Sequence, residues 1–242
     1  MNELALDTTS EFRKGIQSGI SIGIGYTPIA LTFGLLAKTT GLTVVETILM
    51  SLIVFAGASQ YISLSLLTLG TGVFEIVLTT FIVNIRHFLM AAALNEKSEE
   101  DHPAIKMAYS FGITDETFSV AAMKNGAVSA GYMFGLNLIA YSSWVICSGL
   151  GYLIGSNLPQ MLQDSMSVAL YAMFIGLLVP SMKQSVKVVI LAVLAASFNS
   201  IFTVTGVFST GWGIVLSTLL STIIVEVIVT IRNKQRGRMN AQ

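Results

Sequence analysis

Seven apolar runs, each long enough to cross a lipid bilayer, dominate this sequence and leave few folds open to it. A membrane-spanning helix needs about 20 mostly apolar residues. The runs of this length cover roughly 16–37, 44–69, 73–94, 130–156, 165–182, 187–205 and 211–231. Charged residues make up 11% of the 242 residues, against about 25% in a typical soluble domain. We therefore predict an all-α, polytopic transmembrane helix bundle that forms a single integral membrane domain over residues 1–242.

An eighth segment, 104–123, has the length of a span but is polar. Alone it would not insert, yet a polar face turned toward a bundle interior could make it the fourth span. Lysine and arginine favour the cytoplasmic side, so the basic tail, 233–242, predicts a cytoplasmic C-terminus. Charge counting does not separate eight spans from seven. We prefer eight spans, because this arrangement gives Asp115 a role. It places Lys97 outside the cell and Lys124 in the cytoplasm, and seven spans are the alternative.

Composition and motifs exclude several other classes. The net charge is zero, so nothing points to nucleic acid. Cys147 is the only cysteine, which rules out an internal disulfide and offers no metal-binding spacing. No catalytic or cofactor motif is present, and no Walker loop indicates ATP as the driver. Residues 1–9 lack a basic start and a small-residue cleavage site, so no cleaved signal peptide is expected.

Four consecutive segments each place a lipid-incompatible feature at their midpoint. The midpoints fall at or beside Pro28, Gly57, Asn84 and Asp115. Irregular backbone and polar groups at this depth are tolerated only where they are buried in protein or line a cavity. We therefore expect the helices to be broken at the bilayer midplane, and these groups, together with Gln60, to share one wet pocket. Most of the site motifs lie within residues 12–125.

The candidate substrate-binding residues are Gly25, Pro28, Gly57, Ser59, Gln60 and Asn84. Pro28 lacks an N–H and predicts a kinked or unwound turn, which glycine at position 25 makes easier. Freed carbonyls and half-helix ends can hold the ammonium and carboxylate groups of a zwitterion. Each residue also has a purely structural alternative. Pro28 could form an ordinary proline kink, and Gln60 could only bond a neighbouring helix.

The candidate ion-pair and proton-coupling residues are Arg86, His87, Asp115 and Glu116. An arginine so deep costs about 2.5–3.5 kcal/mol on insertion scales, so it needs an acidic partner, which Asp115 or Glu116 could supply. Asp115 and Glu116 are adjacent and face different directions, and we favour Asp115 as the path-lining group. His87 titrates near neutrality and suits a proton relay, although it could simply bond a neighbouring helix.

These residues resemble the AzlC family, the large subunits of branched-chain amino acid exporters. The resemblance rests on the stretches Gly25-Tyr26-Thr27-Pro28-Ile29-Ala30, Phe55-Ala56-Gly57-Ala58-Ser59-Gln60, Asn84-Ile85-Arg86-His87 and Thr114-Asp115-Glu116. It extends over about 12–232, where the second half matches mainly in hydrophobic layout. Ile85 stands where leucine is commoner.

The resemblance implies a secondary exporter of leucine, isoleucine and valine, with methionine as a further candidate substrate, in a bacterial cell membrane. It also implies a small membrane partner of the AzlD type and no cofactor. An ion gradient is the remaining driver, and proton antiport through Asp115 or His87 suffices energetically. The alternatives are a passive channel or a non-transporting assembly subunit. An intramembrane enzyme, with Ser59 as nucleophile and His87 as base, has no supporting motif.

Overall fold

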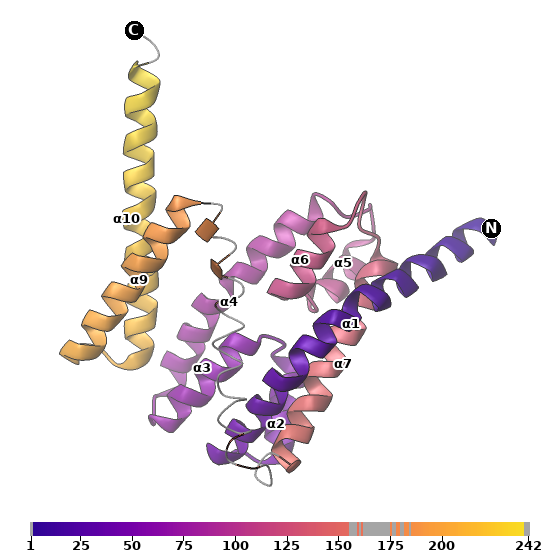
Figure 1. Cartoon of the computed structure of the whole chain (residues 1–242), viewed down its shortest axis with the longest axis horizontal. Coiled ribbons are helices and arrows are strands. Elements are labelled where there is room, and N and C mark those ends of the chain that lie inside the picture. Colours follow the sequence, from indigo (N-terminus) through magenta and orange to yellow (C-terminus); the bar gives the residue numbers. More distant parts are fainter. Residues whose placement is uncertain are drawn as a thin grey trace. The chain divides into compact units, whose positions relative to one another are not determined.

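The structure, a computed structural model, describes residues 2–154 and 185–239 with single positions between them, and side chains only within 11–231. The regular elements in this part of the chain are helices, beside one isolated bridge between Ser98 and Val128. The helices, shown in Figure 1, are α1 (Asn2–Thr39), α2 (Val44–Ile53), α3 (Gly57–Thr68), α4 (Val73–Asn95), α5 (Pro103–Ser110), α6 (Asp115–Met123), α7 (Ala130–Ile154), α9 (Val186–Thr205) and α10 (Thr210–Met239). The predicted all-α class is confirmed.

Five helical segments in the described part are long and apolar enough to cross a membrane. They are Glu11–Thr39, Val73–Asn95, Ala130–Ile154, Val186–Thr205 and Thr210–Ile231. The predicted spans 44–69 and 104–123 are instead each divided into two short helices. The predicted span 165–182 lies outside the described residues, apart from single positions. Helix α10 continues into the basic tail as far as Met239.

Helices α1 and α7 run parallel and pack with their backbones in close contact. Small residues set their separation, because a Cβ at Gly34 would overlap the carbonyl oxygen of Ser148, and a Cβ at Gly15 would overlap that of Tyr132. Both helices therefore start at the same end of the pair, here called the Glu11 end, and finish at the opposite end, called the Thr39 end. The directions of the shorter helices are described relative to these two ends.

Helices α2 and α3 form the first broken helix pair, which enters from the Thr39 end and returns to it. Along α2, Ile48 approaches Gly149 of α7, and the Leu52 carbonyl accepts a hydrogen bond of 2.7 Å from the Tyr141 hydroxyl. Helix α2 thus runs antiparallel to α7.

Helix α3 then runs back toward the Thr39 end alongside α1. The Phe55 ring lies 6.3 Å from the Tyr26 ring, and Tyr61 lies 5.8 Å from Phe33. The backbone between α2 and α3, residues 54–56, is here called the first tip.

Helices α5 and α6 form the second broken helix pair, which enters from the Glu11 end and returns to it. The Asn137 amide of α7 donates to the Tyr109 carbonyl at 2.7 Å. Further along both segments, the Phe111 ring lies 5.9 Å from the Tyr141 ring. Helix α5 therefore runs parallel to α7.

Helix α6 returns toward the start of α1, so that Lys124 pairs with Glu11 at 3.1 Å. The backbone between α5 and α6, residues 111–114, is the second tip.

This arrangement corrects the eight-span prediction. The segment 104–123 does not cross from one end to the other, because Lys97 before it and Lys124 after it lie together. The Lys97 ammonium donates to the Lys124 carbonyl at 2.5 Å. A crossing helix followed by a broken pair thus occurs twice with opposite direction, as α1 with α2–α3 and as α4 with α5–α6. Such inverted repeats build many transporter folds, and no internal repeat was predicted from the sequence.

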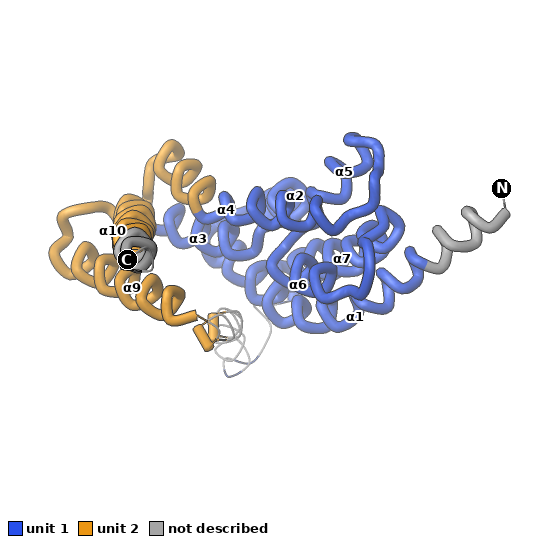
Figure 2. Tube along the Cα trace, turned by 90° about the horizontal axis from the view of Figure 1, so that it is seen from above, with its two compact units in different colours: residues 1–68, 83–172 blue, residues 69–82, 173–242 orange. Residues whose placement is uncertain are grey.

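The chain divides into two compact units, coloured separately in Figure 2. The first comprises residues 1–68 and 83–172 and contains both broken helix pairs, and the second comprises 69–82 and 173–242. Within the second, α9 and α10 form an antiparallel pair joined through Gly206, whose φ of 62° is left-handed. Glu75 binds the start of α10 by accepting hydrogen bonds from the Ser209 hydroxyl and from the Trp212 amide, the latter at 3.1 Å.

Candidate functional site

A cavity of about 290 Å³ lies where the two tips meet α4. Its lining residues are Ile53, Val54, Phe55 and Ala56 from the first tip, Ser110, Phe111 and Ile113 from the second, and Asn84 and His87 from α4. Irregular backbone therefore borders the cavity on two sides, as expected where non-helical chain lines a water-accessible space in a membrane protein. The volume falls near the small end of the range of about 300–1,000 Å³ for small-molecule sites.

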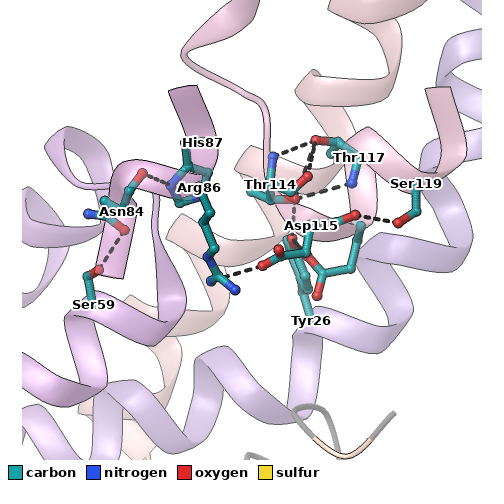
Figure 3. Close-up of polar contacts among 10 residues, drawn as sticks. Tyr26, Ser59, Asn84, Arg86, His87, Thr114, Asp115, Thr117 and Ser119 are labelled. Atoms are coloured by element: carbon teal, nitrogen blue, oxygen red, sulfur yellow. Dashed lines mark hydrogen bonds and ion pairs between the residues drawn. The ribbon is translucent and has the colours of Figure 1, made fainter. Parts of the chain in front are cut away.

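Asn84 and His87 supply the polar side chains of α4 to the cavity. The buried Ser59 hydroxyl donates a hydrogen bond of 2.6 Å to Asn84 Oδ1, which fixes the orientation of the amide and leaves its NH₂ group to the cavity. His87 Nδ1 lies 3.2 Å from the Asn84 carbonyl of its own helix. Asn84 and His87 thus both border the cavity, and Figure 3 shows the two side chains.

Arg86 points away from Asn84 and forms an ion pair with Asp115. Its Nη2 atom lies 2.9 Å from Asp115 Oδ2, and the two side chains are 37% and 24% exposed. Arg86 therefore has the acidic partner that the sequence predicted for it. The pair joins α4 to the start of α6 beside the second tip (Figure 3).

Glu116 faces a different helix from its neighbour, as its adjacency to Asp115 predicted. Its Oε2 atom accepts a hydrogen bond of 2.6 Å from the Tyr26 hydroxyl of α1. The same hydroxyl lies 2.7 Å from Thr114 Oγ1, and Tyr26 is only 4% exposed. Neither Asp115 nor Glu116 lines the cavity itself.

The start of α6 holds both carboxylates in a favourable field. Thr114 is the N-cap residue and forms a capping box with Thr117, which satisfies free N–H groups of the first turn. The helix dipole adds partial positive charge at this end, where anionic side chains are stabilised. The local sequence Thr-Asp-Glu-Thr thus explains both the helix start and the position of its acids.

Gln60 and Gly57 lie in a buried network beside the cavity rather than on its wall. Gln60 is fully buried; its Oε1 accepts from the Trp144 indole N–H at 2.7 Å and its Nε2 donates to Ser51 Oγ at 3.2 Å. A Cβ at Gly57 would approach Trp144 to 2.7 Å. The structure thus shows Gln60 bonding neighbouring helices, the structural alternative considered from the sequence.

Gly25 and Pro28 lie on an exposed face of α1. Helix α1 is continuous through Pro28, so the unwound turn expected there is not found. The breaks occur at the two tips instead. The expectation that Pro28, Gln60, Asn84 and Asp115 share one pocket is therefore wrong in detail, because only Asn84 of these lines the cavity.

Three aromatic residues important to the site were not predicted from the sequence. Tyr26 binds Glu116, Phe55 lines the cavity, and Tyr141 contacts both tips through ring contacts of 5.1 Å to Phe55 and 5.9 Å to Phe111. The Gly-Tyr-Thr-Pro stretch gave the only available signal, since a tyrosine beside a proline at mid-span can carry a hydroxyl into a bundle. Within the described residues, no group of three or more His, Cys, Asp or Glu side chains could hold a metal ion.

Comparison with known proteins places this geometry in a family. Residues 21–158 match the family described as "AzlC protein", a range that contains both broken helix pairs and every cavity residue. The chain belongs to the AzlC family. It is a membrane protein, and no solved structure shows a significant match to it.

Its relatives include proteins from bacteria and from an archaeon. An uncharacterized membrane protein of Archaeoglobus fulgidus is 35% identical over 182 residues, which is 74% of this chain and 80% of that protein. The inner membrane protein YgaZ of Escherichia coli is 29% identical over 201 residues, covering 80% and 82%. The branched-chain amino acid transport protein AzlC of Bacillus subtilis is 26% identical over 148 residues, covering 60% and 58%. This AzlC-family chain is thus related to an amino acid transport protein.

Proposed function

We propose that this AzlC-family chain is a secondary exporter of branched-chain amino acids, driven by the proton gradient across the cell membrane. The observation that carries the proposal is the cavity between two tips that enter from opposite ends of the bundle. The name of the Bacillus subtilis relative supports the class of substrate. Export as the direction, rather than uptake, follows from the family resemblance.

The cavity suits an amino acid with an aliphatic side chain. Val54, Phe55, Phe111 and Ile113 offer apolar surface, while polar groups gather at Asn84 and at the backbone of the tips. We propose that the carboxylate binds the N-terminal end of α3, where free N–H groups and the helix dipole favour an anion. The ammonium group would meet carbonyl oxygens at the ends of α2 and α5. Gln60 supports this region from outside the cavity through Ser51 of α2 and Trp144 of α7, whereas Gly25 and Pro28 lie on an exposed face of α1.

Two opposed broken pairs offer a route to alternating access. If the first pair moves, the cavity opens toward the Thr39 end, and if the second moves, it opens toward the Glu11 end. The Arg86–Asp115 pair and the Tyr26–Glu116 contact both hold the second pair in place. One charge crossing about 150 mV supplies roughly 3.5 kcal/mol, enough for a gradient of a few hundredfold at about 1.4 kcal/mol per tenfold.

The proposal includes a small membrane subunit of the AzlD type, which the family resemblance implies. The proposal involves no catalysis, and the Ser59 hydroxyl donates to Asn84 rather than to the His87 ring. Ser59 and His87 therefore do not form a nucleophile–base pair in this arrangement.

Vesicle transport assays test the proposal. Membrane vesicles with the chain alone, and with the small subunit, are given labelled leucine, isoleucine, valine, methionine or lysine at several external pH values. We expect uphill, gradient-dependent movement of the aliphatic amino acids with overlapping rates, since one methylene changes binding by only about 1–3 kcal/mol, and none for lysine. Purely downhill flux would indicate a channel. An absence of flux with both subunits present would indicate an assembly role.

A further inference from the structure

The two carboxylates at the start of α6 differ in how their charge is balanced. Asp115 lies 2.9 Å from the Arg86 guanidinium, whereas Glu116 contacts the neutral hydroxyl of Tyr26 at 2.6 Å. Among the side chains that the structure describes, no cation forms an ion pair with Glu116. The charge of Asp115 is therefore balanced by Arg86, whereas the charge of Glu116 is met only by neutral hydroxyl groups.

The position of Glu116 along the bundle fits such a role. Its partner Tyr26 lies at the middle of the candidate span Glu11–Thr39, and Asn84 lies at the middle of Val73–Asn95. Glu116 is thus held at the depth of the substrate cavity. A proton carrier must reach this depth to be exposed alternately to the two sides of the membrane.

A chain of hydroxyl groups can satisfy Glu116 in both protonation states. The Tyr26 hydroxyl lies 2.6 Å from Glu116 and 2.7 Å from Thr114 Oγ1, which in turn lies 3.3 Å from Thr117 Oγ1. With Glu116 ionised, Thr114 donates to Tyr26 and Tyr26 donates to the carboxylate. With Glu116 protonated, the carboxyl donates to Tyr26, Tyr26 to Thr114 and Thr114 to Thr117.

When the hydrogen bonds of this hydroxyl series reverse their donor and acceptor roles, no hydroxyl in the series loses its partner. The usual cost of a buried unpaired group is therefore avoided. Thr117 donates to the Gly112 carbonyl at 2.9 Å in either state. Thr114 is the last residue of the second tip, so the reversal takes place next to Ile113, which lines the cavity.

We propose that Glu116 is the residue that binds and releases the transported proton, and that Tyr26 is the positioning residue that bonds it in both states. This inference rests on the proposed function, specifically on proton coupling. The other titratable groups around the second tip are Asp115 and Arg86, which neutralise each other, His87 on α4, and Tyr141, which donates to the Leu52 carbonyl. Among these described groups, Glu116 carries a charge that no ion pair balances, and proton binding removes it.

The test compares exchange with coupled transport by the full chain and its small subunit in proteoliposomes. Exchange of labelled for unlabelled leucine needs no net proton movement, whereas accumulation against a gradient does. A pH difference of one unit supports about tenfold accumulation for each proton moved. We expect Glu116→Gln to abolish this accumulation and leucine-induced proton flux while exchange continues. The matched control is Glu100→Gln, an exposed loop carboxylate, which should behave as wild type.

The possible outcomes separate this inference from the function on which it rests. Coupled accumulation that persists in Glu116→Gln overturns the inference, most directly if Asp115→Asn loses coupling instead. Leucine transport by wild type and by Glu100→Gln that ignores the pH gradient removes proton coupling from the proposed function, and this inference with it.

Infrared difference spectra recorded between low and high pH give a second readout that does not need transport. We expect a protonated-carboxyl band that is present in wild type and Asp115→Asn and absent in Glu116→Gln. If Glu116→Gln does not fold, Tyr26→Phe provides the test of the proposal. Loss of the Tyr26 hydrogen bond to the Glu116 carboxylate should shift the protonated-carboxyl band and raise the midpoint pH of leucine exchange. A band and midpoint that Tyr26→Phe leaves unchanged contradict the assignment.

Discussion

At the scale of single residues, the site separates a balanced charge pair from the polar groups that face the cavity. Arg86 and Asp115 bind each other, while Asn84 turns toward the cavity and is oriented by Ser59. The four-residue stretch from Asn84 to His87 thus serves two purposes, because neighbouring side chains on a helix point in different directions. Mutations within it should have different consequences.

Arg86 and Asp115 should contribute to the stability of the fold as a pair rather than independently. Arg86→Gln and Asp115→Asn should each cost about 1–3 kcal/mol, less than the 3–5 kcal/mol of fully buried pairs because both side chains are partly exposed. The double variant should cost less than the sum of the two. Thermal unfolding in detergent measures this coupling. The exposed Lys187–Glu226 pair is the control, with an expected coupling of about 1 kcal/mol or less. Additive losses at Arg86 and Asp115 would show that the pair contributes nothing.

Asn84→Ala should weaken substrate binding without unfolding the protein. Losing one hydrogen bond to a charged substrate group costs about 1.5–3 kcal/mol, which corresponds to a rise in KM for leucine of roughly tenfold or more. Thr80→Ala is the control, because the Thr80 hydroxyl bonds only carbonyls of its own helix. An unchanged KM in Asn84→Ala would place the substrate elsewhere.

At the scale of helices and loops, the two tips form the walls that an aliphatic substrate would touch. Val54→Leu adds one methylene group to the first tip. It should lower kcat/KM for isoleucine more than for valine, shifting the preference by about tenfold, within the 1–3 kcal/mol that one methylene is worth. Val45→Leu, at an exposed position of α2 outside the cavity, should leave the preference unchanged. Competition between the two labelled substrates measures the ratio, and equal losses for both would argue against contact at Val54.

The sequence predicted the helices well and their breaks only in part. Apolar runs located α1, α4, α7, α9 and α10, because hydropathy and length determine insertion. The break after α2 comes directly before Gly57, the midpoint feature noted in the sequence, but its form depends on tertiary contacts such as the Tyr141 hydroxyl on the Leu52 carbonyl. Hydropathy carries no information on such contacts. Pro28, the strongest local signal for a break, lies within a continuous helix.

The same limit applied to the candidate site. Asn84, Arg86, His87 and Asp115 were recognised because polar groups in apolar runs are conspicuous. Tyr26 and Tyr141, which contact the two tips, look like ordinary apolar bundle residues in the sequence. The Tyr26 hydroxyl donates to Glu116, 90 residues away along the chain, and the Tyr141 hydroxyl donates to Leu52, 89 residues away. Local sequence patterns do not reveal contacts at such separations.

At the scale of the whole molecule, the returning path of α5–α6 determines on which side each loop lies. The basic residues near the Glu11 end are Arg13, Lys14, Lys97, Lys106 and Lys124, and the Thr39 end has Lys38. Positive residues favour the cytoplasm, so we expect the Glu11 end to be cytoplasmic. This differs from the eight-span prediction, which placed Lys97 and Lys124 on opposite sides.

Cysteine labelling of intact cells distinguishes these two topologies. In a Cys147→Ser background, single cysteines replace Glu99 and Asn125, which are exposed in the loops before α5 and after α6, and Thr39 at the end of α1. A membrane-impermeant thiol reagent should label Thr39→Cys in intact cells, and Glu99→Cys and Asn125→Cys only after permeabilisation. Because the Lys97 ammonium contacts the Lys124 carbonyl, the two loops must share one side whichever way the protein is inserted. Labelling of Glu99→Cys and Asn125→Cys from opposite sides would mean that 104–123 crosses the membrane, and the cavity between two opposed broken pairs would then not exist.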